Sequence, residues 1–229
     1  VPFIAKATGI PMAKVAVKAM LGHTLDELGI PDEVELPYVC VKESVFPFIK
    51  LPGVDPVLGP EMKSTGEVMG IDVDFGKAYF KAQLAAGNTL PTKGKIFISV
   101  SKEDQPKMQP IAKKLSELGF EILATDGTKK ALEEAGVRSE LVRKVSQGTP
   151  NVLDSIRAGE VDLIINTPTV GRNQVRDGYA IRRAAIDLRI PYITTVTSAR
   201  AAAQAIESML KGKISIGSLN EYHPKVRKI

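Results

Sequence analysis

Three predicted strand ends in the second half of the chain carry side chains that could bind an anion. In the sharpest, Ala124-Thr125-Asp126-Gly127-Thr128, an apolar strand ends, Gly127 permits a tight turn and Thr128 can cap the following helix. A helix N-terminus offers unpaired N–H groups and partial positive charge, which suits a phosphate, and the two threonine hydroxyls add donors. An ordinary Asp-Gly turn with a threonine cap would use the same residues. The stretch is therefore typical of a phosphate site or of a plain turn.

The other two strand ends are also polar. Asn166 and Thr167 leave an apolar run, where they could bind a base or ribose or satisfy loop backbone, and Thr194 could equally reflect strand propensity. Lys144 is a possible counter-charge, although an isolated lysine is usually solvated. We include Ser99, on the first strand of this half, in the predicted effector site.

Several enzyme templates are missing from the sequence. His23 and His223 are far apart and form no His-Glu-x-x-His helix, and neither Gly-x-Gly nor Gly-x-Ser-x-Gly occurs. A phosphate loop around Lys63-Ser64 fails because Val57 and Met62 occupy the glycine positions. No pair of carboxylates stands out in the second half. We therefore predict no catalytic residue and no metal ligand.

Composition limits the class of protein further. The 229 residues include 31 Lys+Arg against 26 Asp+Glu, a net charge of +5, with 44% hydrophobic and 25% charged residues, which is a globular balance. The single Cys40 excludes an internal disulfide and fits a reducing, cytoplasmic compartment. With no Trp and a modest, dispersed charge we expect no nucleic-acid partner. No apolar run is long enough for a membrane span, so we expect no membrane partner.

The elements that position these residues alternate regularly from Lys95 onward. Strand-like runs lie at Ile96–Val100, Phe120–Ala124, Val161–Ile165 and Tyr192–Val196, with a further short strand at Leu141–Val145. Helical patterns lie at Pro106–Leu118, Thr128–Ala135, Asn151–Ala158, Asp177–Leu188 and Ser198–Leu210. Near-continuous apolar strands alternating with helices predict a doubly wound parallel sheet of the α/β class. Ligands bind such sheets beyond the carboxyl ends of the strands, where the strand order reverses.

The first half is less regular. It predicts a helix over Pro11–Leu21, a short helix capped by Thr24, a strand within Tyr38–Ile49 and a last helix capped by Asp74. This α+β part has too few strands to close its own sheet, as expected for the tail of a larger domain. Because Val1 is not an initiator Met, we expect a cut end of a longer chain.

The run from Gly53 to Gly70, containing Gly59-Pro60-Glu61-Met62-Lys63-Ser64-Thr65-Gly66, resembles the large subunit of carbamoyl phosphate synthase near the end of its second ATP-grasp unit. Lys6–Pro11 and Val41–Glu43 match the same region. The second half resembles the C-terminal regulatory domain of that enzyme, which shares its fold with methylglyoxal synthase. The residues that carry this second resemblance are Thr125–Thr128, Lys144, Asn166, Thr167, Arg182 and Arg183.

This resemblance implies that residues 1–87 are a remnant of the second ATP-grasp unit, 88–94 a linker and 95–229 a methylglyoxal-synthase-like allosteric domain. The full enzyme makes carbamoyl phosphate for pyrimidine and arginine biosynthesis from bicarbonate, glutamine-derived ammonia and ATP, with Mg²⁺ or Mn²⁺. Its partners would be the rest of the large subunit and a glutaminase small subunit. The metal-binding residues of the unit belong before Val1, so we expect this piece to hold no cofactor and to be inactive alone.

Carried over residue by residue, the resemblance implies two effector sites. A nucleoside monophosphate would bind at Ser99, Thr125, Gly127, Thr128, Lys144, Asn166 and Thr167, and ornithine at the domain junction through Glu43 and Thr194. The sequence departs from the family pattern twice: Gln105 stands where a lysine is expected, and Pro168 where a second hydroxyl could serve. Losing one cation and one donor weakens the case for tight uridine or inosine monophosphate binding.

Two alternatives belong to other classes. A methylglyoxal synthase needs an aspartate base within a Gly-Gly-Asp segment, and the corresponding stretch Gln147–Asn151 has Thr149 there instead. The second alternative is an effector-free interaction domain in which the phosphate loop is only a helix cap.

Overall fold

The computed structural model describes residues 1–169 and 172–223, and a five-stranded parallel sheet forms its largest layer. The strand order is β5-β4-β3-β6-β7, so the chain proceeds outward from β3 first on one side and then on the other. This confirms the predicted doubly wound sheet and puts its switch point at β3. The strands are β3 (Lys95–Ser99), β4 (Glu121–Ala124), β5 (Glu140–Leu141), β6 (Leu163–Asn166) and β7 (Tyr192–Ile193).

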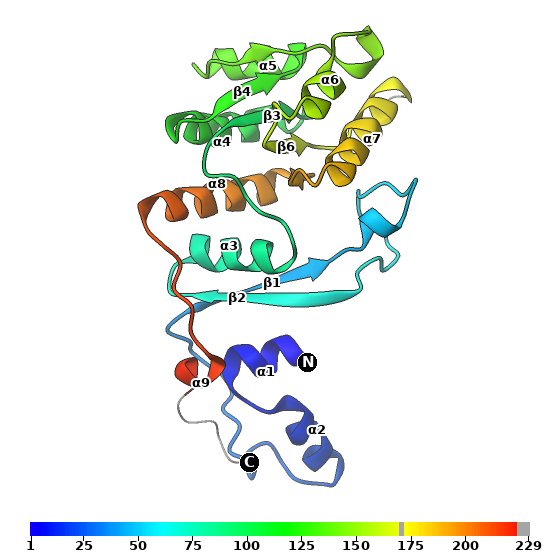
Figure 1. Ribbon diagram of the computed structural model, residues 1–229. Coiled ribbons are helices and arrows are strands. Elements are labelled where there is room, and N and C mark those ends of the chain that lie inside the picture. The colour runs from blue at the N-terminus through cyan, green and yellow to red at the C-terminus, as the bar shows by residue number, and fades with distance from the viewer. Residues whose placement is uncertain (170–171, 224–229) are drawn as a thin grey trace.

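Helices cover both faces of this sheet, as Figure 1 shows. Along β3, Ile96 and Ile98 face one hydrophobic core and Phe97 faces the other, because successive side chains of a strand point to opposite sides. Both sides are fully buried, which explains the nearly continuous apolar run. The first core is closed by α4 (Gln105–Glu117), α5 (Asp126–Glu134) and α8 (Val196–Lys211), and the second by α6 (Val152–Arg157) and α7 (Arg172–Asp187).

Some element boundaries differ from the predictions. The last strand ends at Ile193, not at Val196, because Thr195 caps α8: its Oγ1 accepts from the Ser198 N–H at 3.2 Å. The short strand β5 ends at Leu141, and a 3-10 turn, η2 (Val145–Gln147), follows. Loop and cap hydrogen bonds thus shorten the edge strands relative to their apolar patterns.

The first part of the chain forms a two-stranded antiparallel sheet with helices around it. Val39 of β1 lies opposite Asp72 of β2. Asp74 caps α3 as predicted, with its carboxylate accepting from the Lys77 N–H at 2.8 Å. Thr24 makes its capping contacts with Glu27, but the segment forms turns and no helix. The elements are α1 (Pro2–Thr8), α2 (Met12–Met20), β1 (Val39–Val45), η1 (Phe48–Lys50), β2 (Gly66–Asp72) and α3 (Phe75–Ala85).

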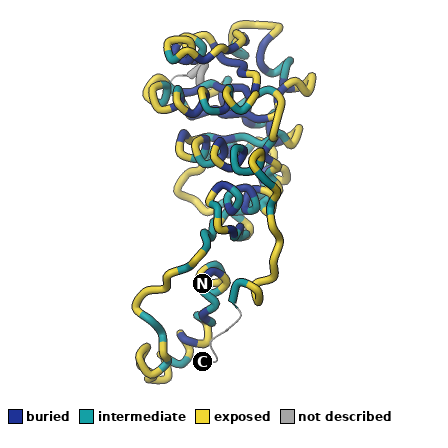
Figure 2. The backbone as a smooth tube through the Cα atoms, turned by 90° about the vertical axis from the view of Figure 1, so that its left-hand side faces the viewer, coloured by how far each residue is buried: buried dark blue, intermediate teal, exposed yellow. Residues whose placement is uncertain are grey.

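The helix α3 lies between the small sheet and α8, and so joins the two halves (Figure 1). A Cβ on Gly70 of β2 would lie 1.9 Å from the Ala78 carbonyl oxygen, so strand and helix backbones touch there. On the opposite side, a Cβ on Gly76 would meet Ser208 of α8. Phe80 of α3 belongs to the core of the large sheet. The halves therefore share one core at this layer, and Figure 2 shows buried stretches in each of the stacked layers.

The end of the molecule that contains α1 and α2 is mostly exposed or half-buried (Figure 2). The short helix α9 (Leu219–Tyr222) returns to this end, where His223 Nε2 lies 2.7 Å from the Lys6 carbonyl oxygen and Nδ1 lies 3.2 Å from Tyr38 Oη. The predicted 95–229 unit thus includes a tail that contacts the first half, and its last six residues lie outside the described ones.

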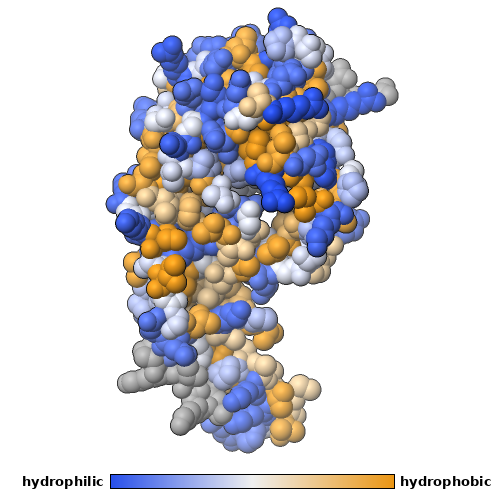
Figure 3. All heavy atoms as spheres, in the orientation of Figure 1, coloured by the Kyte–Doolittle hydropathy of each residue, from blue (hydrophilic) through white to orange (hydrophobic). Residues whose placement is uncertain are grey.

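On the face seen in Figure 3, hydrophobic side chains reach the surface in scattered patches between hydrophilic ones. The described residues contain no helix that is both long and apolar enough to cross a bilayer.

Candidate functional site

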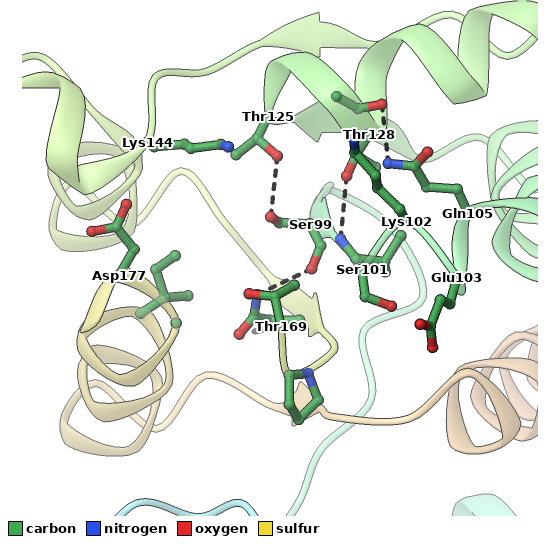
Figure 4. Close-up of a pocket in the computed structure, with 16 residues that line it drawn as sticks. Ser99, Ser101, Lys102, Glu103, Gln105, Thr125, Thr128, Lys144, Thr169 and Asp177 are labelled. Carbon is green, nitrogen blue, oxygen red and sulfur yellow. Dashed lines mark hydrogen bonds between the residues drawn. The ribbon is translucent and has the colours of Figure 1, made fainter. Parts of the chain in front are cut away.

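A pocket of about 420 Å³ opens at the carboxyl ends of β3, β4 and β6, at the switch point of the sheet (Figure 4). Its lining includes six of the seven residues predicted for the nucleotide effector: Ser99, Thr125, Gly127, Thr128, Lys144 and Asn166. The seventh, Thr167, lines a neighbouring pocket instead. The geometry therefore brings together residues from three strand ends, as expected for a doubly wound sheet.

Two threonine hydroxyls form the inner wall of the pocket. Thr125 is the N-cap residue of α5, and its Oγ1 lies 3.1 Å from Ser99 Oγ. Thr128 Oγ1 accepts from the Val100 N–H at 3.2 Å, and the residue is only 2% exposed. The prediction that Thr128 caps the helix is therefore wrong: α5 starts at Asp126, and Thr128 ties its first turn to the end of β3.

The prediction that Gly127 makes a tight turn is also wrong, because this residue lies inside the first turn of α5. Its carbonyl oxygen accepts from Gln105 Nε2 at 3.3 Å, and a Cβ here would come no closer than 3.8 Å to any neighbour. Without a side chain, Gly127 leaves the space at the N-terminal end of α5 open. Its φ is not positive, so the backbone conformation itself does not require glycine. The nearby Asp126 carboxylate pairs with Lys130, four residues along the helix.

Positive charge reaches the pocket from opposite sides. Lys144 extends toward Thr125 from the segment after β5 (Figure 4), and Lys102 lies on the loop after β3. The N-terminal end of α5 adds partial positive charge between them. Gln105, at the position where a lysine was expected, uses its amide to hold Gly127. Hydroxyls, helix N–H groups and two amines around one hollow can bind a phosphate-sized anion.

Asn166 forms the floor of the pocket and is already hydrogen-bonded on both sides of its amide. Its Nδ2 donates to the Ser99 carbonyl oxygen at 3.0 Å, and its Oδ1 accepts from Arg182 Nη1 at 2.7 Å. Thr167, 2% exposed, accepts from the Ser101 N–H at 2.9 Å and so shapes the loop after β3. Both residues therefore stabilise the backbone at the end of β3 and in the loop that follows it, next to the pocket.

Sequence reasoning missed several lining residues. Ser101 and Glu103 come from the loop that follows β3, and Asp177 and Ile181 from α7. The loop residues could have been found from their position directly after a central strand at the switch point. Residues of α7 gave no such signal, because they reach the pocket only through the packing of that helix across β6.

A second pocket of about 320 Å³ lies next to the first, at the N-terminal end of α8. Thr194 lines it together with Thr167, Lys107 and Arg200. Glu43, predicted as its partner for ornithine, lines neither pocket. The structure thus does not place the two residues in one cavity.

Glu43 is nevertheless part of the junction between the halves. Burial raises the pKa of its carboxyl above the ordinary value, and a hydrogen bond with Gln83 partly opposes this. Burial, and next the charge of Glu43, raise the pKa of Tyr79 to about 12, while a hydrogen bond with Ser198 of α8 lowers it in part. Ser198 in turn accepts from Thr195 Oγ1 at 2.9 Å. Polar side chains therefore connect β1, α3 and the start of α8.

Over residues 1–169 and 172–223 no group of three or more His, Cys, Asp or Glu side chains could hold a metal ion.

Comparison with known proteins places this geometry in a family. An MGS-like domain model matches residues 107–194. The carbamoyl phosphate synthase large chain of Archaeoglobus fulgidus is 57% identical over 224 residues, which cover 97% of this chain and 21% of that protein. The C-terminal section of this large chain in Methanopyrus kandleri is 57% identical over 228 residues, which cover 97% of this chain and 42% of that protein. The large chain of Methanosarcina mazei is 54% identical over 227 residues, which cover 99% of this chain and 21% of that protein.

The chain thus spans about a fifth of the length of these full large chains and less than half of the C-terminal section. The similarity, in contrast, extends over both halves of the chain, from the small sheet to the regulatory fold. The chain belongs to the carbamoyl phosphate synthase large-chain family, as a counterpart of its C-terminal section.

Proposed function

We propose that this chain is the regulatory end of a carbamoyl phosphate synthase large subunit, and that its 420 Å³ pocket binds a nucleoside monophosphate effector. The complete enzyme would convert ATP, bicarbonate and glutamine to carbamoyl phosphate in the cytoplasm, with Mg²⁺ or Mn²⁺. The partners would be the rest of the large subunit and a glutaminase small subunit. This chain supplies effector binding, whereas phosphoryl transfer takes place in the remainder of the enzyme.

The observation that carries the proposal is the convergence of donors at one end of the pocket. Thr125, Thr128 and Ser99 present hydroxyls beside the first turn of α5, and Lys144 extends toward them. The lining also contains the apolar residues Val100, Pro168 and Ile181, which suit a base. The volume also lies in the range of small-molecule sites, roughly 300–1,000 Å³.

A second effector, ornithine, would bind at the junction through Glu43 and Thr194. The half-buried carboxylate of Glu43 favours this, because an ammonium group would compensate its desolvation. Calorimetric titration with ornithine tests it: wild type should bind and Glu43→Gln should not. Equal affinity of the two proteins would remove Glu43 from the site.

The experiment for the main proposal is a calorimetric titration of the 229-residue chain with uridine and inosine 5′-monophosphates. Lys144→Met should weaken binding about tenfold or more, because a cation next to a phosphate contributes roughly 1.5–3 kcal/mol. Lys113→Met is the matched control, since Lys113 is exposed on α4 and lies outside the pocket. No binding by wild type, or equal losses in both variants, would refute the proposal.

The chain alone should show neither ATPase nor carbamoyl phosphate production. A coupled assay with ATP, bicarbonate, ammonia and Mg²⁺ measures this. Any turnover above a buffer blank would contradict the proposal that phosphoryl transfer takes place in the remainder of the enzyme.

A further inference from the structure

A chain of polar contacts, buried at Asn166 and half-buried at Asp55, runs from the floor of the pocket into the first half of the protein. Arg182 of α7 donates from Nη1 to Asn166 Oδ1 at 2.7 Å. The same guanidinium donates from Nε and Nη2 to the two carboxylate oxygens of Asp55, at 2.9 and 2.6 Å. Asp55 lies 127 positions earlier in the sequence, on the segment between β1 and β2. One side chain therefore links the pocket to this segment.

The link has a fixed geometry. Arg182 is 4% exposed, and a buried guanidinium is stable only when its charge and N–H groups are matched by partners. Asp55 matches it with a two-pronged pairing that a lysine could not reproduce. Desolvation raises the pKa of Asp55, but the hydrogen bonds from Arg182 and the Val57 N–H, together with nearby positive charge, outweigh it and lower the pKa overall.

The surroundings of α7 support the same connection. A Cβ on Gly178 would lie 2.8 Å from Arg182 Nη1 and 3.3 Å from Asn166 Oδ1, so the glycine leaves room for their contact beside the pocket. The next residue, Arg183, donates to the carbonyl oxygens of Phe48 and Leu51 at 3.2 and 3.1 Å. Consecutive arginines of α7 thus hold the segment at Phe48, Leu51 and Asp55, but only Arg182 also bonds to a residue that lines the pocket, Asn166.

We propose that Arg182 is a positioning residue that couples the segment 48–57 to the effector pocket through Asp55 and Asn166. Its guanidinium orients the Asn166 amide, which holds the Ser99 carbonyl and with it the end of β3. A displacement of the segment shifts this amide, and a ligand that fixes the pocket restrains the segment. Such coupling is reciprocal. If the position of the segment 48–57 changes the affinity of the pocket for its ligand, binding of the ligand must shift the equilibrium between positions of the segment by the same factor.

The first experiment needs no ligand. Hydrogen exchange is measured on the 229-residue chain for a peptide covering 97–105, which contains the Val100 and Ser101 amides that bond to the pocket threonines. Asp55→Asn and, with its charge retained, Arg182→Lys should each exchange at least fivefold faster there than wild type. Exchange in β4 serves as the reference for any loss of global stability, and the fivefold increase is counted beyond the change seen there.

Arg183→Gln is the matched control, because it releases the segment at Phe48 and Leu51 but leaves the contacts of Arg182 intact. It should speed exchange over 48–57 and leave the pocket peptide within twofold of wild type. The inference would be overturned if the peptide 97–105 exchanged at the wild-type rate in both Asp55→Asn and Arg182→Lys. It would also be overturned if Arg183→Gln increased the exchange rate of this peptide as much as those two variants do.

The second experiment adds uridine 5′-monophosphate, and this arm rests on the proposed function. Saturation should slow exchange over 48–57 at least threefold in wild type and have no such effect in Arg182→Lys. If wild type binds the nucleotide but 48–57 does not respond, the coupling is refuted while the effector site stands. If wild type fails to bind, the effector proposal falls, and the ligand-free result alone decides whether Arg182 couples the two regions.

Discussion

Replacing Thr128 by valine removes a hydroxyl that accepts from the Val100 N–H and that we propose as a donor to the effector phosphate. Valine has nearly the same shape, so the packing of this buried position is kept. The Val100 N–H, which donates to Thr128 Oγ1, would lose its acceptor in a site where Val100 is itself only 6% exposed. An orphaned buried donor costs about 1–3 kcal/mol. At roughly 2–4 °C per kcal/mol for a chain of this size, Tm should fall by about 2–12 °C.

The same change removes one hydroxyl from the proposed phosphate site. A hydrogen bond to a charged group contributes about 1.5–3 kcal/mol, so affinity for uridine 5′-monophosphate should fall roughly 10- to 150-fold. Thr128→Ser keeps the hydroxyl, so its affinity should stay within about threefold of wild type, and the lost methyl group should cost only about 0.8 kcal/mol of stability. Thermal denaturation measures the Tm, and titration calorimetry in phosphate-free buffer measures the affinity. A valine variant with wild-type stability and affinity would refute both contacts.

Three further predictions follow from other contacts. Gly70→Ala must separate β2 from α3, because its Cβ would lie 1.9 Å from the Ala78 carbonyl oxygen. Its free energy of unfolding in urea should fall by about 2–3 kcal/mol. Gly66→Ala, which has open space around it, should unfold like wild type. Asp55 has a lowered pKa in the folded state, so its contribution to stability is present above its ordinary value of 3.8 and is lost as the pH falls below it. Stability curves of wild type and Asp55→Asn should therefore converge in acid, and a constant gap would contradict the pairing. Gln105→Lys adds a cation at the pocket and should tighten nucleotide binding about fivefold in low salt and less in high salt, as titrations at two ionic strengths would show.

The parallel sheet could be predicted from the sequence because its strands are buried on both faces. Ile96, Phe97 and Ile98 form an apolar run that serves two cores at once, and such runs between helical patterns are typical of this fold. The strand β2 was missed, since Gly70 weakens its strand propensity and only its contact with α3 explains the glycine.

The lining of the pocket could be predicted only where its residues follow strand ends. Ser99, Thr125 and Asn166 have this local signal. The partner of the Thr128 hydroxyl is an N–H group 28 positions away, so local turn chemistry indicated a cap that does not form. The pairing of Arg182 with Asp55 gave no signal in the sequence, because it depends on how the halves pack together.

The placement of α3 has a practical consequence for dissecting the molecule. Its Phe80 packs into the core of the large sheet, although the helix comes before the turn-rich stretch 88–94. A recombinant fragment that starts after this stretch would leave the matching surface on α8 uncovered and open to water. Truncations intended to isolate the regulatory fold should therefore retain α3, and a protease cut at 88–94 should leave both pieces bound to each other through non-covalent contacts.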